Sequence, residues 1–281
     1  MKLQQRAAGV ALLALLVLAA GGTARAASRP LWEAGLGIGA ISFPDYTGSD
    51  QQRSYLVPVP YFVYRGRILK ADRNGVQARL FGSTRLRAYV SASASPPVYS
   101  SQDRVRSGMP DVHAAVGIGP ALEVRLWHSA GRRARLQLLL PLQAVYGIAL
   151  PLRQVGWYSN PVLNLDLTDP HARYSWNLGL QAGPIFTDQR YAQTYYGVAP
   201  AYANAARPAY RAPGGYGGSQ FTVALSKRYA RFWVGAFMRY YDLAGAGYAA
   251  SPLVTARHNI AAGVGIAWIL GQSAQEVQRG D

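Results

Sequence analysis

The sequence predicts an all-β protein, a transmembrane antiparallel β-barrel of about twelve strands. Three observations lead to this prediction. The chain opens with an export signal, apolar and polar residues then alternate in many segments of roughly ten residues, and no later stretch is apolar for long enough to span a bilayer as a helix. Alternation places every second side chain on the same face of a strand, as in a wall with lipid on one side and a polar lumen on the other.

Residues 1–26 form the predicted signal peptide. Lys2 and Arg6 provide a charged start, and residues 7–20 are almost entirely apolar. Ala24 and Ala26 are small residues at the positions that a signal peptidase reads. Because the apolar run is shorter than the ~20 residues that span a bilayer, we expect cleavage after Ala26 rather than an anchoring helix. The expected destination is the cell outer membrane.

The first half of the mature chain contains six candidate strands. In the first, glycines alternate with apolar residues, which leaves one face bare and suits space in a lumen. The second carries Pro58 and Pro60, so we expect it to be irregular, bulged or near a rim. Asn74-Gly75 is a strong hairpin signal before the third. The candidates are Trp32–Phe43, Tyr55–Tyr64, Val76–Leu80, Leu86–Ala94, Val112–Trp127 and Ala134–Ile148, with a long polar loop at Pro96–Pro110.

The second half continues the alternation after a change of composition. Tyr191–Gly218 is rich in Tyr, Ala, Pro and Gly and predicts an extended loop with a short strand near Tyr195. Tyr248–His258 predicts a last loop before the closing strand. The candidate strands are Leu163–Thr168, Asn177–Ala182, Phe221–Ser226, Phe232–Asp242 and Asn259–Leu270.

The length of the chain fits twelve strands. Removing 26 residues from 281 leaves 255, or roughly 21 for each strand with its turn. Bacterial barrels have even strand counts, so ten is the alternative. We therefore expect a barrel over residues 27–270 and a polar C-terminal tail over 271–281. A soluble periplasmic sandwich would show the same alternation, but Tyr and Trp near many segment ends favour the membrane.

The charge balance is strongly basic. The chain has 29 Lys and Arg against 13 Asp and Glu, a net charge of +16, which falls to +13 without Lys2, Arg6 and Arg25. Nucleic acid is the usual partner of such a charge, but an exported protein rarely meets it. Lipopolysaccharide, murein carboxylates or an anion-attracting lumen fit the compartment better, and frequent arginine in a GC-rich genome is the alternative. The absence of cysteine excludes disulfides and thiolate metal sites.

No pattern in the sequence indicates catalysis, a cofactor or a metal. His113, His128, His171 and His258 are far apart and lack metal-site spacing. No G-x-S-x-G elbow is present. The carboxylate pairs Asp45/Asp50 and Asp166/Asp169 border predicted turns, and we interpret them as turn residues because aspartate commonly bonds the backbone there. We expect a protein that is not an enzyme.

Arginines on the polar face are the candidate site residues. Arg79, Arg85 and Arg87 would lie on neighbouring strands facing one lumen, and Arg239 on a later strand would join them. An arginine facing lipid at the midplane costs about 2–4 kcal/mol, which favours inward placement. Their arrangement predicts either an anion-attracting pore lining or a lumen filled by salt bridges and hydrogen bonds.

Short stretches spread over the mature chain resemble the MipA/OmpV family of outer-membrane proteins. They are Pro44-Asp45-Tyr46-Thr47-Gly48-Ser49, Pro60-Tyr61-Phe62-Val63-Tyr64-Arg65-Gly66, Gly108-Met109-Pro110-Asp111, Gly119-Pro120, Gly183-Pro184, Tyr195-Tyr196-Gly197-Val198, Gly214-Gly215-Tyr216-Gly217-Gly218 and Ser251-Pro252-Leu253-Val254. One departure is the closing strand, in which Leu270 stands where family members often end in an aromatic residue.

The resemblance implies an outer-membrane barrel without known catalytic or cofactor residues. It implies a scaffold that links a murein-cleaving lytic transglycosylase to a bifunctional penicillin-binding murein synthase. Other members are discussed as adhesins or entry routes for small molecules. The alternatives are therefore a narrow channel with a basic lumen, or adhesion through the Tyr191–Gly218 loop.

Overall fold

The computed structural model describes residues 29–65, 69–72, 75–83, 85–131, 133–168 and 176–277, and the predicted signal peptide 1–26 lies outside them. The strands of the described part form one large sheet and one two-stranded sheet. The elements are β1 (Arg29–Pro30), β2 (Trp32–Pro44), β3 (Gln52–Arg65), β4 (Leu69–Asp72), β5 (Gly75–Gly82), β6 (Leu86–Ser95), β7 (Ala115–His128), β8 (Ala134–Pro141), β9 (Gln143–Gly147), β10 (Arg153–Ser159), β11 (Val162–Thr168), β12 (Trp176–Thr187), α2 (Gln189–Tyr196), β13 (Gly215–Arg228), β14 (Phe232–Asp242), β15 (His258–Gln272) and β16 (Glu276–Val277), with short 3-10 turns at Ser100–Gln102 and Pro200–Tyr202.

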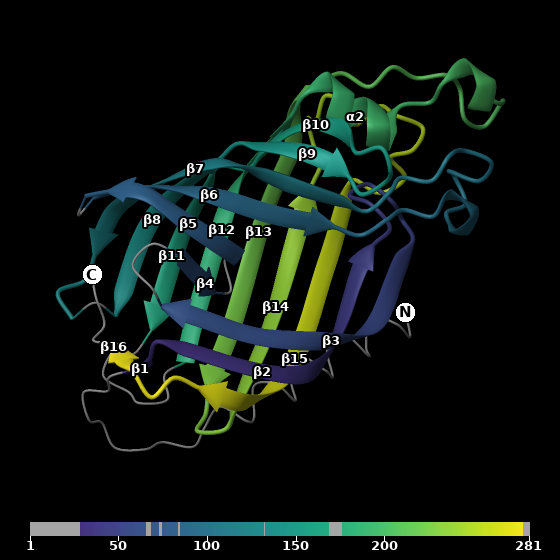
Figure 1. Cartoon of the computed structure of the whole chain (residues 1–281). Coiled ribbons are helices and arrows are strands. Elements are labelled where there is room, and N and C mark those ends of the chain that lie inside the picture. The colour runs from purple at the N-terminus through teal and green to yellow at the C-terminus, as the bar shows by residue number, and fades with distance from the viewer. Residues whose placement is uncertain are drawn as a thin grey trace.

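The large sheet closes into an antiparallel ring (Figure 1). Starting at β7, the pairings run through β6, β5, β4, β3, β2, β15, β14, β13, β12, β11 and β8, and β8 pairs with β7 again. The closing ladder joins Ala121 to Pro141 at one end and His128 to Arg135 at the other. The predicted all-β antiparallel barrel of twelve strands is confirmed.

Two of these twelve positions are interrupted strands, so the sheet has 14 segments. β9 continues β8 along β7 after a break at Leu142, and β10 precedes β11 along β12 with a break at Asn160 and Pro161. The prolines beside these breaks cannot donate to a ladder. Other hydrogen bonds hold the chain to the neighbouring strands at the breaks. Leu142 N donates to Pro120 O at 2.9 Å, and Asn160 Nδ2 donates to Pro184 O at 2.7 Å.

The barrel is apolar outside and polar inside, which is the reverse of a soluble protein. Leu36 on β2 is 55 % exposed and Leu56 on β3 is 77 % exposed, whereas Glu33 and Asn164 are only 2 % exposed. Other exposed apolar side chains are Ile38, Phe62, Ile118, Met238, Ile260, Trp268 and Leu270, and other buried polar ones are Glu123, Gln137, Asp166, Gln220 and Thr222. This arrangement fits a barrel surrounded by lipid rather than the soluble alternative.

The weakest junction in the described ring lies beside β3. This strand pairs with β2 along its whole length without a register shift, from Trp32↔Tyr64 to Pro44↔Gln52, but it pairs with β4 through Tyr64 and Arg65. Pro58 and Pro60 therefore leave the register with β2 undisturbed, although neither can donate to a ladder. The prolines predict an irregular, bulged or rim strand, whereas the structure shows a regular strand that lacks a described partner along part of one edge.

The two ends of the barrel differ. The long connections 45–51, 96–114, 188–214 and 243–257 all lie at the end that carries α2, and the short turns 129–133 and 229–231 lie at the other end, near β1 and β16 (Figure 1). Outer-membrane barrels place long loops outside the cell and short turns in the periplasm. We refer to the two ends as the long-loop end and the short-turn end.

Two local predictions differ from the structure. The region near Tyr195 forms the helix α2 and not a strand, because Asp188 caps its N-terminus by accepting a hydrogen bond from Tyr191 N at 2.8 Å. The closing strand β15 extends to Gln272, two residues into the predicted tail, and β16 pairs with β1 beyond it. No helix in the described part of the chain is both long and apolar enough to cross a membrane.

Glycines on β2 allow the close approach of β15. A methyl group on Gly37 would overlap the backbone oxygen of Ile266, whereas one on Gly265 would meet its nearest neighbour, Val59 Cγ2, at 3.4 Å. We expect Gly37→Ala to destabilise the barrel by about 1–3 kcal/mol, the usual cost of overpacking, and Gly265→Ala to have little effect. Urea unfolding of the refolded barrel, followed by its mobility on unboiled gels, measures both. Equal stability of the two variants would contradict this account of the β2–β15 contact.

Candidate functional site

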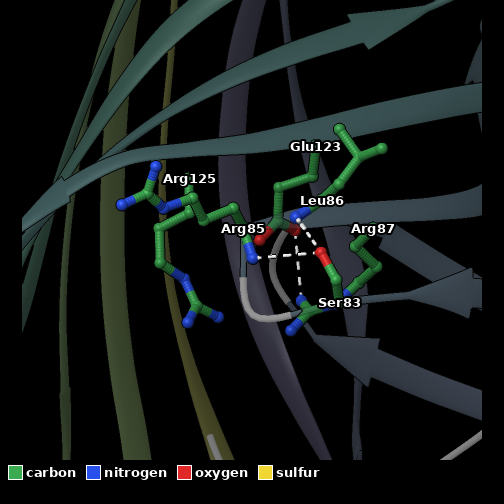
Figure 2. A pocket seen from close by; sticks show the side chains of 6 residues that line it. All are labelled: Ser83, Arg85, Leu86, Arg87, Glu123 and Arg125. Carbon is green, nitrogen blue, oxygen red and sulfur yellow. Dashed lines mark hydrogen bonds and ion pairs between the residues drawn. The ribbon is translucent and has the colours of Figure 1, made fainter.

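Glu123 is the centre of the polar contacts inside the short-turn half of the barrel. It lies on β7 and is 6 % exposed. Its Oε2 atom accepts from Arg87 Nη1 on β6 at 3.1 Å, and its Oε1 atom accepts from Gln137 Nε2 on β8 at 2.6 Å (Figure 2 shows the Arg87 contact). Both carboxylate oxygens are therefore occupied by donors from the two neighbouring strands.

The contacts continue around the inner wall from Gln137. Asn164 Nδ2 on β11 contacts Gln137 Oε1 at 3.3 Å and Asp166 Oδ2 at 3.1 Å, and Gln181 Nε2 on β12 donates to Asn164 Oδ1 at 3.0 Å. Asp166 is thus a buried residue of a strand, and its assignment to a turn is wrong. Strand β11 continues to Thr168, so Asp166 lies within the strand, and its side chain is 6 % exposed.

The four predicted arginines have different surroundings. Arg87 forms the ion pair with Glu123, while Arg85 is exposed at the short-turn end of β6. Arg239 on β14 donates to Thr222 Oγ1 at 3.0 Å and lies 3.4 Å from the Tyr241 hydroxyl. Arg79 is placed by register opposite Tyr89, and its side chain lies outside the described part. Arg87 and Arg239 are therefore held in separate contacts on different walls.

The four long connections pack together into a cap with a hydrophobic core of its own. We define the cap as residues 45–51, 96–114, 188–214 and 243–257. The connections leave the ring at separate strand pairs but meet over one mouth of the barrel (Figure 1). The buried core residues are Tyr46, Val98, Val112, Ala192, Tyr195, Tyr196, Val198, Ala212, Leu243, Ala246, Tyr248 and Leu253.

Arg106 is buried in the cap and joins two of its connections. Its Nη1 atom donates to Tyr195 O at 3.0 Å and its Nε atom to Ser100 Oγ at 3.2 Å, while its guanidinium lies 5.7 Å from the centre of the Tyr46 ring. Burial lowers the pKa of Arg106, and the nearby Tyr46 and Asp103 oppose this effect. Because the guanidinium must satisfy its donors away from water, its position fixes the connections around it.

A second buried arginine in the cap has a similar role. Arg207 is 8 % exposed and donates from Nη1 to Val105 O at 2.7 Å and to Ser107 O at 3.0 Å. Its Nη2 atom donates to Tyr202 O at 2.7 Å. Arg106 and Arg207 thus tie the 96–114 and 188–214 connections to each other at two points.

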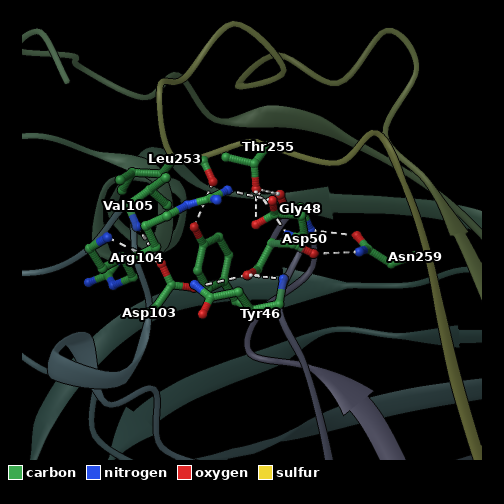
Figure 3. A network of polar contacts seen from close by, with 12 residues as sticks. Tyr46, Gly48, Asp50, Asp103, Arg104, Val105, Leu253, Thr255 and Asn259 are labelled. Carbon is green, nitrogen blue, oxygen red and sulfur yellow. Dashed lines mark hydrogen bonds and ion pairs between the residues drawn. The ribbon is translucent and has the colours of Figure 1, made fainter. Parts of the chain in front are cut away.

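The 45–51 connection is held to the last connection and to β15 (Figure 3). The hydroxyl of Tyr46 donates to Leu253 O at 2.6 Å. The Asn259 side chain accepts a hydrogen bond from Gly48 N at 2.7 Å and donates one to Ser49 O at 2.8 Å. Gly48 has φ +106°, a backbone conformation that is strained for residues with a side chain, so glycine is required at this turn.

The cap also contains the residues that link across to the 96–114 connection. Ser49 Oγ donates to Asp103 Oδ2 at 2.9 Å, and the other oxygen of Asp103 accepts from the backbone of Val105 and Arg106 at 3.1 Å each. All three acceptor contacts satisfy a carboxylate that is 1 % exposed. The cap is therefore closed by polar contacts as well as by its apolar core.

Histidines and acidic residues do not gather into a metal site within the described residues. His258 contacts Asp242 at 3.4 Å and the Tyr240 hydroxyl at 2.8 Å, and His128 Nδ1 lies 3.2 Å from Ser129 O. His113 is exposed, and His171 lies outside the described residues. Asp45 forms an ion pair with Arg53 at the mouth, as expected of a turn residue beside a strand.

Comparison with protein families adds to this geometry. A family model described as MltA-interacting protein MipA matches residues 36–270, which is more than half of the chain. The chain belongs to the MipA family. No curated protein is similar enough to this sequence to count as a match.

The MipA match extends from β2 to β15 and therefore includes all four connections of the cap. Five of the stretches that resemble the MipA/OmpV family lie in or beside the cap, at 44–49, 108–111, 195–198, 214–218 and 251–254. Sequence reasoning did not single out Asp103, Arg106, Arg207 or Asn259, since the first three are single polar residues in loops and Asn259 is one polar residue near the start of β15. The sequence signal that could have indicated the cap is the clustering of the MipA/OmpV-like stretches in the long loops.

The two cap arginines at positions 104 and 106 allow a direct test. We expect Arg106→Leu to loosen the cap by about 1–3 kcal/mol, because several buried acceptors lose their donor. Arg104→Leu should have little effect, because its ion pair with Asp50 is solvent-exposed. Hydrogen exchange should accelerate in 96–114 and 188–214 only in the first variant, with the barrel strands unchanged. Equal exchange in both variants would contradict the role given to Arg106.

Burial of the cap tyrosines predicts a loss of cap stability in alkali. Burial raises the pKa of Tyr248 to about 12 and also raises the pKa of Tyr46, Tyr195 and Tyr196. The tyrosines of an opened cap ionise near pH 10, whereas the same tyrosines in the closed cap keep their protons. The closed state is therefore fully favoured below pH 10 and loses about 1.4 kcal/mol per tyrosine for each further pH unit. Tyrosinate absorbance should show a component near pH 12 that Tyr248→Phe removes; a single transition near pH 10 would contradict this.

Proposed function

We propose that this protein is a non-enzymatic barrel of the outer membrane that acts as a scaffold for murein-remodelling enzymes. The observation that carries the proposal is the match to the MipA family over residues 36–270. The family description names MltA, a murein lytic transglycosylase, so the first proposed partner is an enzyme of that type. The second proposed partner is a bifunctional penicillin-binding murein synthase.

The two ends of the barrel suggest which surface carries the enzymes. The cap joins its four connections at the long-loop end through Arg106, Arg207 and Asn259. Exposed arginines at that end, including Arg104, Arg190, Arg211 and Arg257, suit the anionic lipopolysaccharide of the outer surface. Murein lies on the periplasmic side, so the short-turn end is the proposed binding face for the enzymes.

The lumen contacts bear on the channel alternative. Arg87 is neutralised by Glu123, and Arg239 is hydrogen-bonded to Thr222, so these two arginines are engaged in contacts with the wall. The cap stands over one mouth. Both features support a barrel whose interior is filled and braced, which suits a scaffold better than a pore.

The absence of cysteine from the chain permits a site-specific test. Gly131→Cys places one thiol on the exposed β7–β8 turn, where Gly131 has no crowded neighbour, and Ala205→Cys places one on the exposed outer part of the cap. Each thiol is coupled to a maleimide-polyethylene glycol chain. We expect the bulky group at residue 131 to weaken binding of a purified lytic transglycosylase by about tenfold or more, about 1.4 kcal/mol or more.

The same group at residue 205 is the matched control and should change the Kd by less than about twofold. Binding is measured by titrating the labelled enzyme onto the barrel in lipid nanodiscs. Failure of the unmodified barrel to bind either a lytic transglycosylase or a penicillin-binding synthase would overturn the scaffold proposal. Loss of binding only with the group at residue 205 would move the binding face to the cap.

A further inference from the structure

A small hollow at the short-turn end is lined by three arginines. It lies between the start of β6 and the end of β7 and is a shallow recess open to solvent, without an enclosed cavity. Its lining residues are Ser83, Arg85, Leu86, Arg87, Glu123 and Arg125, and Figure 2 shows Arg85 and Arg125 on the same side of Glu123. The hollow is distinct from the cap, which stands at the other end of the barrel.

The charges around the hollow do not balance. Glu123 is its one acidic lining residue, and both carboxylate oxygens already accept from Arg87 and Gln137. Among the residues that the structure describes, neither Arg85 nor Arg125 has an ion-pair partner. The described lining thus carries two positive charges more than it neutralises.

One of these arginines is also short of an acceptor. The Nε atom of Arg125 is buried and has no hydrogen-bond partner among the described residues, and the same is true of Arg135 Nε on the adjoining strand β8. A buried donor without an acceptor is unfavourable in a folded protein and calls for an explanation such as a missing ion or ligand. An anionic oxygen bound at the Arg125 guanidinium would neutralise its charge.

The backbone places Arg85 and Arg125 next to each other where β6 and β7 adjoin. Arg125 N donates to Arg85 O at 2.8 Å, which links the last part of β7 to the residue before β6. Ser83 Oγ accepts from Arg85 N at 3.3 Å and from Leu86 N at 3.1 Å, so Ser83 is held to the start of β6. Two planar guanidinium groups on fixed backbone are suited to bind the paired oxygens of a carboxylate.

We propose that this hollow binds a free carboxylate of a murein stem peptide. The proposal rests on the proposed function in one respect, the placement of the short-turn end in the periplasm. The hollow is shallow and lies between two strand ends, so a carboxylate on a slender, flexible chain reaches its arginines from the open side. Murein carries such carboxylates at every stem peptide, and many weak contacts to one polymer add to each other.

Co-sedimentation with purified murein sacculi tests the proposal with the whole refolded barrel in detergent. We expect Arg85→Gln combined with Arg125→Gln to reduce the bound fraction at low salt about tenfold. The matched control is Arg104→Gln combined with Arg231→Gln, which removes the same charge from exposed positions on the cap and on the β13–β14 turn. It should bind within about twofold of the unmodified protein. Mobility on unboiled gels checks that every variant is folded.

Sacculi whose carboxylates have been amidated provide the second arm. The unmodified barrel should bind them about as weakly as the hollow variant binds native sacculi. Equal binding of native and amidated sacculi, or an equal loss in both double variants, would overturn the proposal and leave only a general attraction of charge. Absence of sacculus binding by the unmodified barrel would overturn it as well.

The lytic transglycosylase titration separates this proposal from the scaffold role. Loss of sacculus binding with enzyme binding retained in the hollow variant supports a murein site that acts independently of the enzyme. Loss of enzyme binding with sacculus binding retained would overturn the murein proposal and assign the hollow to an acidic segment of the enzyme. Failure of the unmodified barrel to bind the enzyme counts against the scaffold proposal and leaves the murein-binding proposal unaffected.

Discussion

The closed ring of backbone hydrogen bonds is the constraint on which the rest of this structure depends. In a lipid environment each unpaired N–H or C=O is costly, so a sheet must return to its own first strand. The β7–β8 ladder accomplishes this. Closure then forces alternate side chains inward, which explains why the polar residues of β7, β8, β11 and β12 meet in one interior. The sparse β3–β4 junction, with prolines on the edge beside it, marks where the ring is least reinforced.

Polar contacts inside the ring replace the apolar core of a soluble protein. Glu123 receives donors from β6 and β8, and Asn164 continues the contacts to β12. Such a network is stable only when each buried member is paired. Arg125 Nε on β7 and Arg135 Nε on β8 depart from this rule among the described residues, and the place of Arg125 at the short-turn end connects it with the proposed murein site.

The cap shows how long loops become ordered without regular secondary structure. Arg106 and Arg207 donate to backbone carbonyls of connections that are about a hundred residues apart in sequence, and Asn259 binds the turn at Gly48. The MipA stretches at these places are therefore packing and turn residues. This explains why the family resemblance identifies the fold and compartment more sharply than a chemical activity.

The sequence by itself determined the barrel, most of its strands and the position of its long loops, because alternation, turn residues and strand length are local properties. It favoured twelve strands over ten, but β4 and β10 lie outside the candidate strands. It misjudged the residues near Tyr195, where the Asp188 cap favours a helix, and Asp166, which belongs to the strand rather than to the turn that follows. Only the tertiary structure decided which face lies inward, that Arg87 meets Glu123, and that four loops form one cap. Those outcomes depend on register and closure between distant strands, which no local pattern specifies.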